Sequence, residues 1–182
     1  MKKEPKLLGE ERRNRILQLL KNHQSPITGT ELAKKANVSR QVIVGDITLL
    51  KARNEPIIAT SQGYIYMAQN EQQTQYERTI ACRHAPADVQ QELQLLVDTG
   101  ATVKDVKVEH PVYGDLVASI MVHNRRDVQQ FLQKIQDTKA TYLSQLTNGI
   151  HLHTISASST QILDEAEAAL QKAGFLVTEN EE

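Results

Sequence analysis

Two histidines in the last third of the chain have the spacing of metal ligands. His151 and His153 form a His-x-His pair within residues 150–154, a segment that we expect to be a β-strand. Residues two apart on a strand point to the same face, so the two imidazoles would lie close enough to bind one metal ion. Leu152, between them, would then point into the core. A pair of exposed histidines on a solvent-facing sheet is the alternative, because so short a motif also occurs by chance.

Two further candidate ligands lie earlier in the chain. His84 follows a predicted strand, and Glu92 lies two turns inside the next predicted helix, on a face that also holds Asp88. Three imidazoles and one carboxylate are donors of intermediate softness, which suit a divalent ion such as zinc, nickel, cobalt or iron. The single cysteine, Cys82, cannot form an internal disulfide, and we interpret it as a small buried side chain of a strand.

The elements that would position these residues alternate between strand and helix. Their predicted order is β-α-β-β-α-β-β-α-β, and connections of hairpin length favour a mixed or antiparallel sheet with helices on one face. This second module is therefore predicted to be a two-layer α/β domain, and the fold class of the whole chain is α+β. The predicted strands cover residues 78–83, 103–109, 116–123, 142–146, 150–156 and 175–178, and the predicted helices cover 86–99, 125–138 and 160–173.

The first part of the chain has a different pattern, three helices followed by a hairpin. This order is that of a winged helix-turn-helix. Apolar residues at positions i, i+4 and i+7 of the third helix would face the core, namely Ile43, Ile47 and Leu50. The predicted helices cover residues 9–23, 30–36 and 39–53, and the predicted strands cover 57–60 and 64–67, with Gly63 at the tip of the hairpin.

The third helix would present its other face to the major groove of DNA. Arg40 and Gln41, in its first turn, can each form two hydrogen bonds with a base, guanine and adenine respectively. The same face holds Val44, Thr48 and Lys51, and phosphate contacts are expected from Lys34, Lys35 and Arg12 or Arg13. A three-helix module that binds protein, with merely solvated charges, is the alternative.

Gly45 also stands on this face, at the middle of the third helix. Glycine at such a position costs about 1 kcal/mol of helix stability relative to alanine. Close approach of the backbone to DNA and simple tolerance of the glycine would each account for it.

Charge divides the chain in the same place as the pattern of elements. The formal charge of the whole chain is −1, but residues 1–70 carry 12 basic and 6 acidic side chains, and the remainder has a net charge of −7. A basic module is typical of a polyanion partner. We predict a DNA-binding domain over 1–68, a polar, glutamine-rich linker over 69–75 and a second domain over 76–182. No apolar run is long enough to span a membrane, so we expect a cytoplasmic protein without a membrane partner.

Residues 12–67 resemble the winged helix-turn-helix of the biotin-operon repressors and of many small-molecule-responsive bacterial repressors. A more specific resemblance covers nearly the whole chain, from about residue 10 to residue 178. It is to the bacterial niacin-responsive repressors that carry a three-histidine (3H) domain. This resemblance rests on three segments that follow the winged helix in order, RHAPADVQQEL, VEHPVYGDL and NGIHLHTI.

The resemblance implies a homodimeric repressor of nicotinate uptake or salvage genes, with nicotinic acid or nicotinamide as co-repressor. It also implies a C-terminal fold similar to the phosphocarrier protein HPr, and a divalent metal, nickel or zinc, held by His84, Glu92, His151 and His153. We therefore expect that the protein is not an enzyme. A metalloenzyme fused to a DNA-binding head, with Asp88 or Glu109 as general base, and a purely metal-responsive regulator are the alternatives.

The loop from His110 to Gly114 is the candidate for effector contact. Proline and glycine fix its backbone between two predicted strands and place His110 beside Tyr113. We predict that Tyr113 stacks on the pyridine ring of the effector, and that His110 or an open metal position receives the carboxylate. A tight turn with a buried tyrosine is the alternative.

Overall fold

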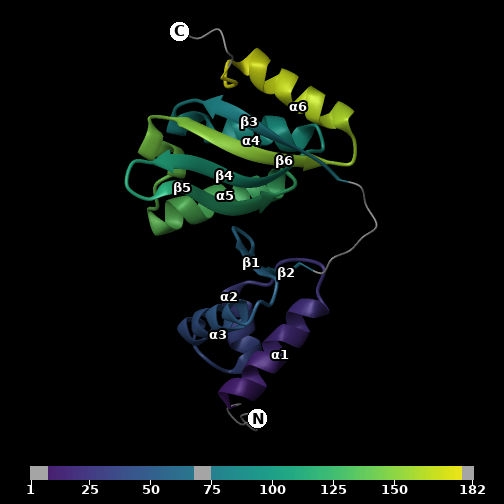
Figure 1. Cartoon of the computed structure of the whole chain (residues 1–182), viewed down its shortest axis with the longest axis vertical. Coiled ribbons are helices and arrows are strands. Elements are labelled where there is room, and N and C mark those ends of the chain that lie inside the picture. Colours follow the sequence, from purple (N-terminus) through teal and green to yellow (C-terminus); the bar gives the residue numbers. More distant parts are fainter. Residues whose placement is uncertain (1–7, 68–74, 178–182) are drawn as a thin grey trace. The chain divides into compact units, whose positions relative to one another are not determined.

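The computed structural model describes residues 8–67 and 75–177, which form two compact units (Figure 1). The chain divides between Asn70 and Glu71, close to the boundary expected from charge and pattern. The linker predicted over 69–75 lies, except for its last residue, outside the described residues. The predicted α+β class is confirmed, with a helical first unit and a mixed second unit.

The first unit has the predicted order of three helices and a two-stranded hairpin. Its core contains Ile43, Ile47 and Leu50 of the third helix, as the spacing indicated, packed against apolar residues of the other helices. The elements are α1 (Gly9–Lys21), α2 (Gly29–Ala36), α3 (Arg40–Ala52), β1 (Ile57–Thr60) and β2 (Gly63–Tyr66).

Local signals in the sequence fix the start of α3 and the position of the hairpin. The Ser39 hydroxyl accepts a hydrogen bond from the Val42 amide at 3.3 Å, which satisfies one of the free N–H groups at the helix start. Gly63 begins β2, and a Cβ at this position would lie 2.5 Å from the carbonyl oxygen of Ile27. The glycine therefore lets the hairpin pair with Ile27, through two backbone hydrogen bonds between Ile27 and Tyr64.

The second unit is a four-stranded antiparallel sheet with its helices packed on one face (Figure 1). The strands lie in the order β3-β6-β4-β5, and α4 lies against both α5 and α6. This is the predicted two-layer arrangement. The elements are β3 (Tyr76–Arg83), α4 (Val89–Asp98), β4 (Thr102–His110), β5 (Gly114–Val122), α5 (Arg125–Thr138), β6 (Ile150–Ala157) and α6 (Thr160–Ala173), with short 3-10 helices η1 (Pro86–Asp88) and η2 (Leu143–Thr147).

The predicted order of nine elements is wrong in its fourth strand. Residues 143–147 form η2, because the Gln145 side chain accepts a hydrogen bond from the Tyr142 amide at 2.8 Å and closes a turn. The left-handed residues Asn148 and Gly149 then end this helix. The predicted last strand, 175–178, is reduced to a single bridge between Leu176 and Cys82, and its final residue lies outside the described part of the chain.

Candidate functional site

The four predicted metal ligands come together in the interior of the second unit. Glu92, on α4, lies between three histidine rings, and all four side chains are at most 3 % exposed. The Nε2 atoms of His84 and His153 lie 2.8 and 3.3 Å from Glu92 Oε2. The Nε2 atom of His151 lies 3.1 Å from Glu92 Oε1.

The second nitrogen of each ring is bound to the backbone. The Nδ1 atoms of His84, His151 and His153 lie 2.8, 2.8 and 2.7 Å from carbonyl oxygens, those of Ala85, Gly149 and Asp105 respectively. A carbonyl oxygen only accepts, so each Nδ1 must donate a proton. Each neutral ring therefore directs an Nε2 lone pair toward Glu92, which is how histidine ligands of metals are commonly oriented.

The result is a buried cluster of acceptors that needs a cation or protons at its centre. Three Nε2 lone pairs and a carboxylate cannot donate to one another, and a buried group without a partner is costly. His84 Nε2 is fully buried, and when the ring is unprotonated there Glu92 Oε2, 2.8 Å away, cannot donate to it. The donor set and this unsatisfied lone pair fit a divalent transition ion of the kind that imidazole and carboxylate ligands bind.

Without a metal, the cluster is held by shared protons. Burial opposes the charged form of Glu92, but the charge of His153 and hydrogen bonds from the three rings outweigh burial and hold the pKa of Glu92 well below its ordinary value. Burial also lowers the pKa of His84 and His153, but interaction with Glu92 outweighs it and raises the pKa of both.

Irregular backbone around the cluster orients two of the rings. A β-bulge in β4 between Val103 and Asp105 turns the Asp105 carbonyl toward His153. The Asp105 carboxylate accepts a hydrogen bond from the Thr154 amide at 3.0 Å, which fixes the bulge against β6. Gly149, whose carbonyl binds His151, packs so closely that a Cβ there would lie 2.3 Å from the His84 carbonyl oxygen.

The predicted orientation of the His-x-His pair was right about the shared face and wrong about its direction. His151 and His153 point into the core, and Leu152 is 39 % exposed on the uncovered face of the sheet. The structure inverts the usual preference for a buried leucine, because the polar partners of the two histidines, namely His84, Glu92 and backbone carbonyls, lie inside.

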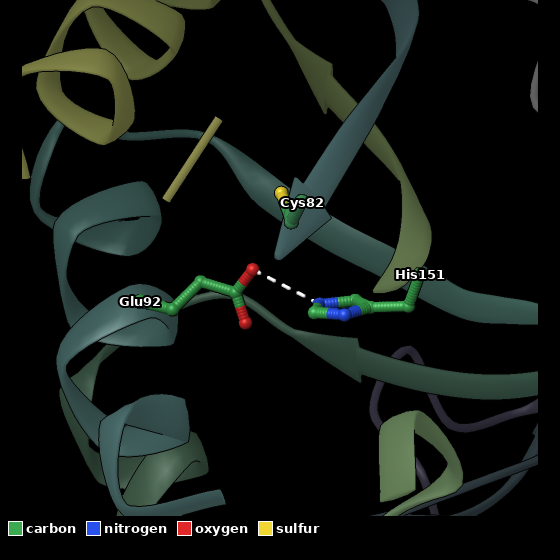
Figure 2. Close-up of side chains that lie close together, drawn as sticks. All are labelled: Cys82, Glu92 and His151. Atoms are coloured by element: carbon green, nitrogen blue, oxygen red, sulfur yellow. Dashed lines mark hydrogen bonds and ion pairs between the residues drawn. The ribbon is translucent and has the colours of Figure 1, made fainter. Parts of the chain in front are cut away.

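Cys82 is buried in β3, as interpreted from the sequence, but its position beside the histidine cluster was not predicted (Figure 2). It lies opposite His151 in the pairing of β3 with β6, and its Sγ, a Glu92 carboxylate oxygen and a His151 ring nitrogen all lie within 4.8 Å of one another. Burial, and then the charge of Glu92, raise the pKa of the Cys82 thiol, which keeps it protonated. The register of β3 against β6, which cannot be read from the sequence, brings Cys82 to the site.

A small cavity opens beside the histidines. It has a volume of about 200 Å³, below the roughly 300 Å³ at which pockets for drug-sized ligands begin, so a single aromatic ring suits it better. Phe131 and Tyr142 lie in its wall with ring centroids 6.4 Å apart, and Glu92, His151 and His153 border it. Its other lining residues are mostly apolar, including Val89, Leu93, Val106, Ile120 and Ile135.

The loop predicted to contact the effector lies elsewhere in the unit. His110 and Tyr113 stand side by side at the turn between β4 and β5, with ring centroids 5.0 Å apart. Tyr113 is 74 % exposed, so the alternative of a buried tyrosine is wrong. Neither residue lines the cavity beside the histidines.

The predicted DNA-contacting residues lie on the surface of the first unit. Arg40, Gln41, Thr48, Lys34 and Lys35 are exposed, and Val44 is half-buried on the same side of α3.

Arg12 and Arg13 are instead engaged within the fold. Arg12 forms a two-pronged ion pair with the buried carboxylate of Asp46, at 2.5 and 3.1 Å, and Arg13 reaches the same group at 3.5 Å. These two arginines hold α1 against α3.

Comparison with known proteins decides the family. The model of the 3H domain matches residues 77–179, and that of an HTH domain matches residues 12–65. The chain is 60 % identical to the transcription repressor NadR of Bacillus subtilis (strain 168) over 178 residues, covering 97 % of this chain and 99 % of that protein. It belongs to the 3H-domain transcription repressors.

A more distant relative supports the same assignment for this 3H repressor. A Thermotoga maritima protein named "Probable transcription repressor NiaR" is 36 % identical over 174 residues, which cover 96 % of this chain and 98 % of that protein. The chain is thus a DNA-binding repressor and not an enzyme, which removes the metalloenzyme alternative. No helix among residues 8–67 and 75–177 is long and apolar enough to cross a membrane.

Proposed function

We propose that this 3H repressor controls niacin uptake or salvage genes, with nicotinic acid or nicotinamide as co-repressor and a divalent metal in its sensor unit. The observation that carries the proposal is the pairing of a buried cluster of three histidines and Glu92 with a small apolar cavity. The names of the relatives, NadR and NiaR, agree with regulation of NAD-related genes.

The metal would be held by His84, Glu92, His151 and His153, whose donors suit nickel or zinc, the two ions that the family resemblance implies. When bound, it supplies a concentrated positive charge and can accept a further donor atom. The chain contributes ring orientation through the three Nδ1–carbonyl hydrogen bonds, which also keep the Nε2 lone pairs free for the ion.

The cavity would hold the pyridine ring of the effector. Phe131 and Tyr142 offer aromatic contact, and the surrounding apolar side chains exclude water. Its described lining residues include no lysine or arginine, so a carboxylate there would meet only the charges of Glu92 and the histidines. In metal-free protein the charge of Glu92 offsets that of the protonated histidines, so nicotinic acid should bind metal-loaded protein only. Neutral nicotinamide should depend less on the metal.

The first unit would bind operator DNA as one head of a homodimer. Lys34 and Lys35 would contact phosphates, while Arg40, Gln41, Val44 and Thr48 of α3 would face bases. A ligand shifts an equilibrium only through different affinities for its states. The co-repressor must therefore favour the arrangement of the two heads that fits both half-sites.

A gel-shift titration on the upstream region of a niacin-transport gene tests the proposal. We expect nicotinic acid to tighten binding of metal-loaded protein by about tenfold or more, within the usual range of allosteric coupling, and a chelator to abolish that effect. Binding that follows metal concentration and ignores both niacin forms would instead indicate a purely metal-responsive regulator. No effect of either ligand would overturn the proposal.

A further inference from the structure

Gly45 is a glycine that its own domain does not require. It lies at the middle of α3 on the exposed face. A Cβ added there would meet nothing within 4 Å, and the residue is not among those with positive φ. Gly63, by contrast, has both a positive φ and a backbone carbonyl at 2.5 Å from its would-be Cβ. Neither packing nor backbone conformation therefore excludes alanine from position 45.

The glycine weakens the helix in which it stands. Glycine has the poorest helix propensity after proline, because the unfolded chain loses more freedom when it becomes helical. A position that violates a local rule without a return inside the fold is expected to serve function. The reason for Gly45 should then lie in what α3 contacts.

At the centre of the exposed face of α3, side chains project little from the backbone around Gly45. Gln41 precedes it by one turn and Thr48 follows it by almost one turn, so the three share a face. The Thr48 hydroxyl donates to the Val44 carbonyl at 2.8 Å, which turns it back onto the helix. The long cationic side chains, Arg40 and Lys51, stand at the two ends of the helix.

We propose that Gly45 is a specificity-determining residue, because it lets the backbone of α3 approach the floor of the major groove closely enough for Gln41 and Thr48 to reach base edges. A methyl group at position 45 would meet the base edges first and hold the helix away. This inference rests on the proposed function of α3 as the recognition helix. It adds that the missing side chain, and not only those present, sets how the helix docks.

The variant Gly45→Ala, made in the full-length protein, distinguishes three cases: Gly45 allows close docking on DNA, is merely tolerated, or is needed for the fold. We expect the melting temperature of the first unit to rise by about 4 °C or more, since alanine is the better helix former. Operator affinity should nevertheless fall by about tenfold, the scale of one lost pair of base contacts. Affinity for unrelated duplex DNA of equal length should stay within about twofold of that of the unmutated protein. Phosphate contacts do not depend on how deeply α3 enters the major groove.

Two further variants keep the outcomes distinct. Asn14→Ala, at an exposed position of α1, is a matched control that also improves helix propensity and should leave operator binding unchanged. Gln41→Ala tests whether α3 reads bases at all, and unchanged operator affinity in that variant would contradict the proposed recognition helix itself. If Gln41→Ala weakens operator binding and Gly45→Ala does not, or if Gly45→Ala lowers the melting temperature, the inference about Gly45 is wrong.

Discussion

The two units of this repressor differ in how they balance their buried charges. In the first unit the buried carboxylate of Asp46 is matched inside the fold by Arg12 and Arg13. In the second unit the buried carboxylate of Glu92 faces three imidazoles, whose charge depends on protons or on a metal. The buried carboxylate of the first unit is therefore balanced by the fold itself, whereas that of the second would be balanced by protons or by the proposed metal. This is the property expected of a sensor attached to a DNA-binding head.

The largest expected effect is the loss of metal binding when a ligand of the cluster is removed. His153→Ala should lower affinity for nickel or zinc by about a thousandfold, since four ligands share a binding free energy of about 10–16 kcal/mol. Competition with a chromophoric chelator measures this. His123→Ala, at an exposed histidine outside the cluster, is the control and should bind metal normally. Equal loss in both variants would contradict the assignment of the ligands.

The matching test in the first unit removes its internal charge balance. Asp46→Ala leaves two arginine side chains without their shared partner at the contact of α1 with α3. Breaking a largely buried pair on one side typically costs about 3 kcal/mol or more. Chemical denaturation should show that loss in the first unit only, with metal affinity of the second unit unchanged. A change in metal affinity would show that the units are not independent in this respect.

Metal removal should lower the stability of the second unit and leave that of the first unit unchanged. A ligand present at 100 times its dissociation constant adds about 2.7 kcal/mol to the stability of the form that binds it. We therefore expect chelation to lower the melting temperature of the second unit by several degrees while the first unit melts as before. Calorimetry with and without chelator measures both transitions, and a shift confined to the first unit would be incompatible with this proposal.

A smaller effect is expected from pH in metal-free protein. The raised pKa values of His84 and His153 contribute stability that is present below about pH 6.5 and is lost as pH rises through their folded-state values. The lowered pKa of Glu92 contributes stability that is present above about pH 4.5 and is lost on further acidification. The metal-free second unit should thus melt at lower temperature at pH 8 than at pH 6. Metal-loaded protein should not show that decline, because its ligands are neutral imidazoles, and parallel profiles for both forms would contradict the charge balance described above.

Helix boundaries could be predicted well where the sequence carries its own end signals. The predicted limits of α5 and α6 match the structure, since Asn124 and Ser159 cap the two helices through their side chains. The strand predicted at 142–146 failed because hydrogen bonds between Tyr142 and Gln145 stabilise η2, and strand propensity does not include them.

The candidate metal ligands could be named from the sequence, but their surroundings could not be predicted. Alternation along β6 established that His151 and His153 share a face, and only the position of Glu92 on α4 shows that this face is the buried one. Cys82 joins the cluster through strand register, and the cavity is built from α4, β4, β5, α5, η2 and β6 together. Such long-range juxtapositions leave no local pattern in a single sequence, which is why the residues that line the cavity were not predicted.

The most direct test of the proposed sensor is calorimetric titration of nicotinic acid into three samples: metal-loaded protein, chelator-treated protein and metal-loaded Phe131→Ala. We predict saturable binding to the first, no detectable binding to the second, and binding weakened by about tenfold in the third, because the variant removes an aromatic wall of the cavity. Equal affinity of nicotinic acid for metal-loaded and chelator-treated protein would contradict recognition of the effector at the histidine cluster.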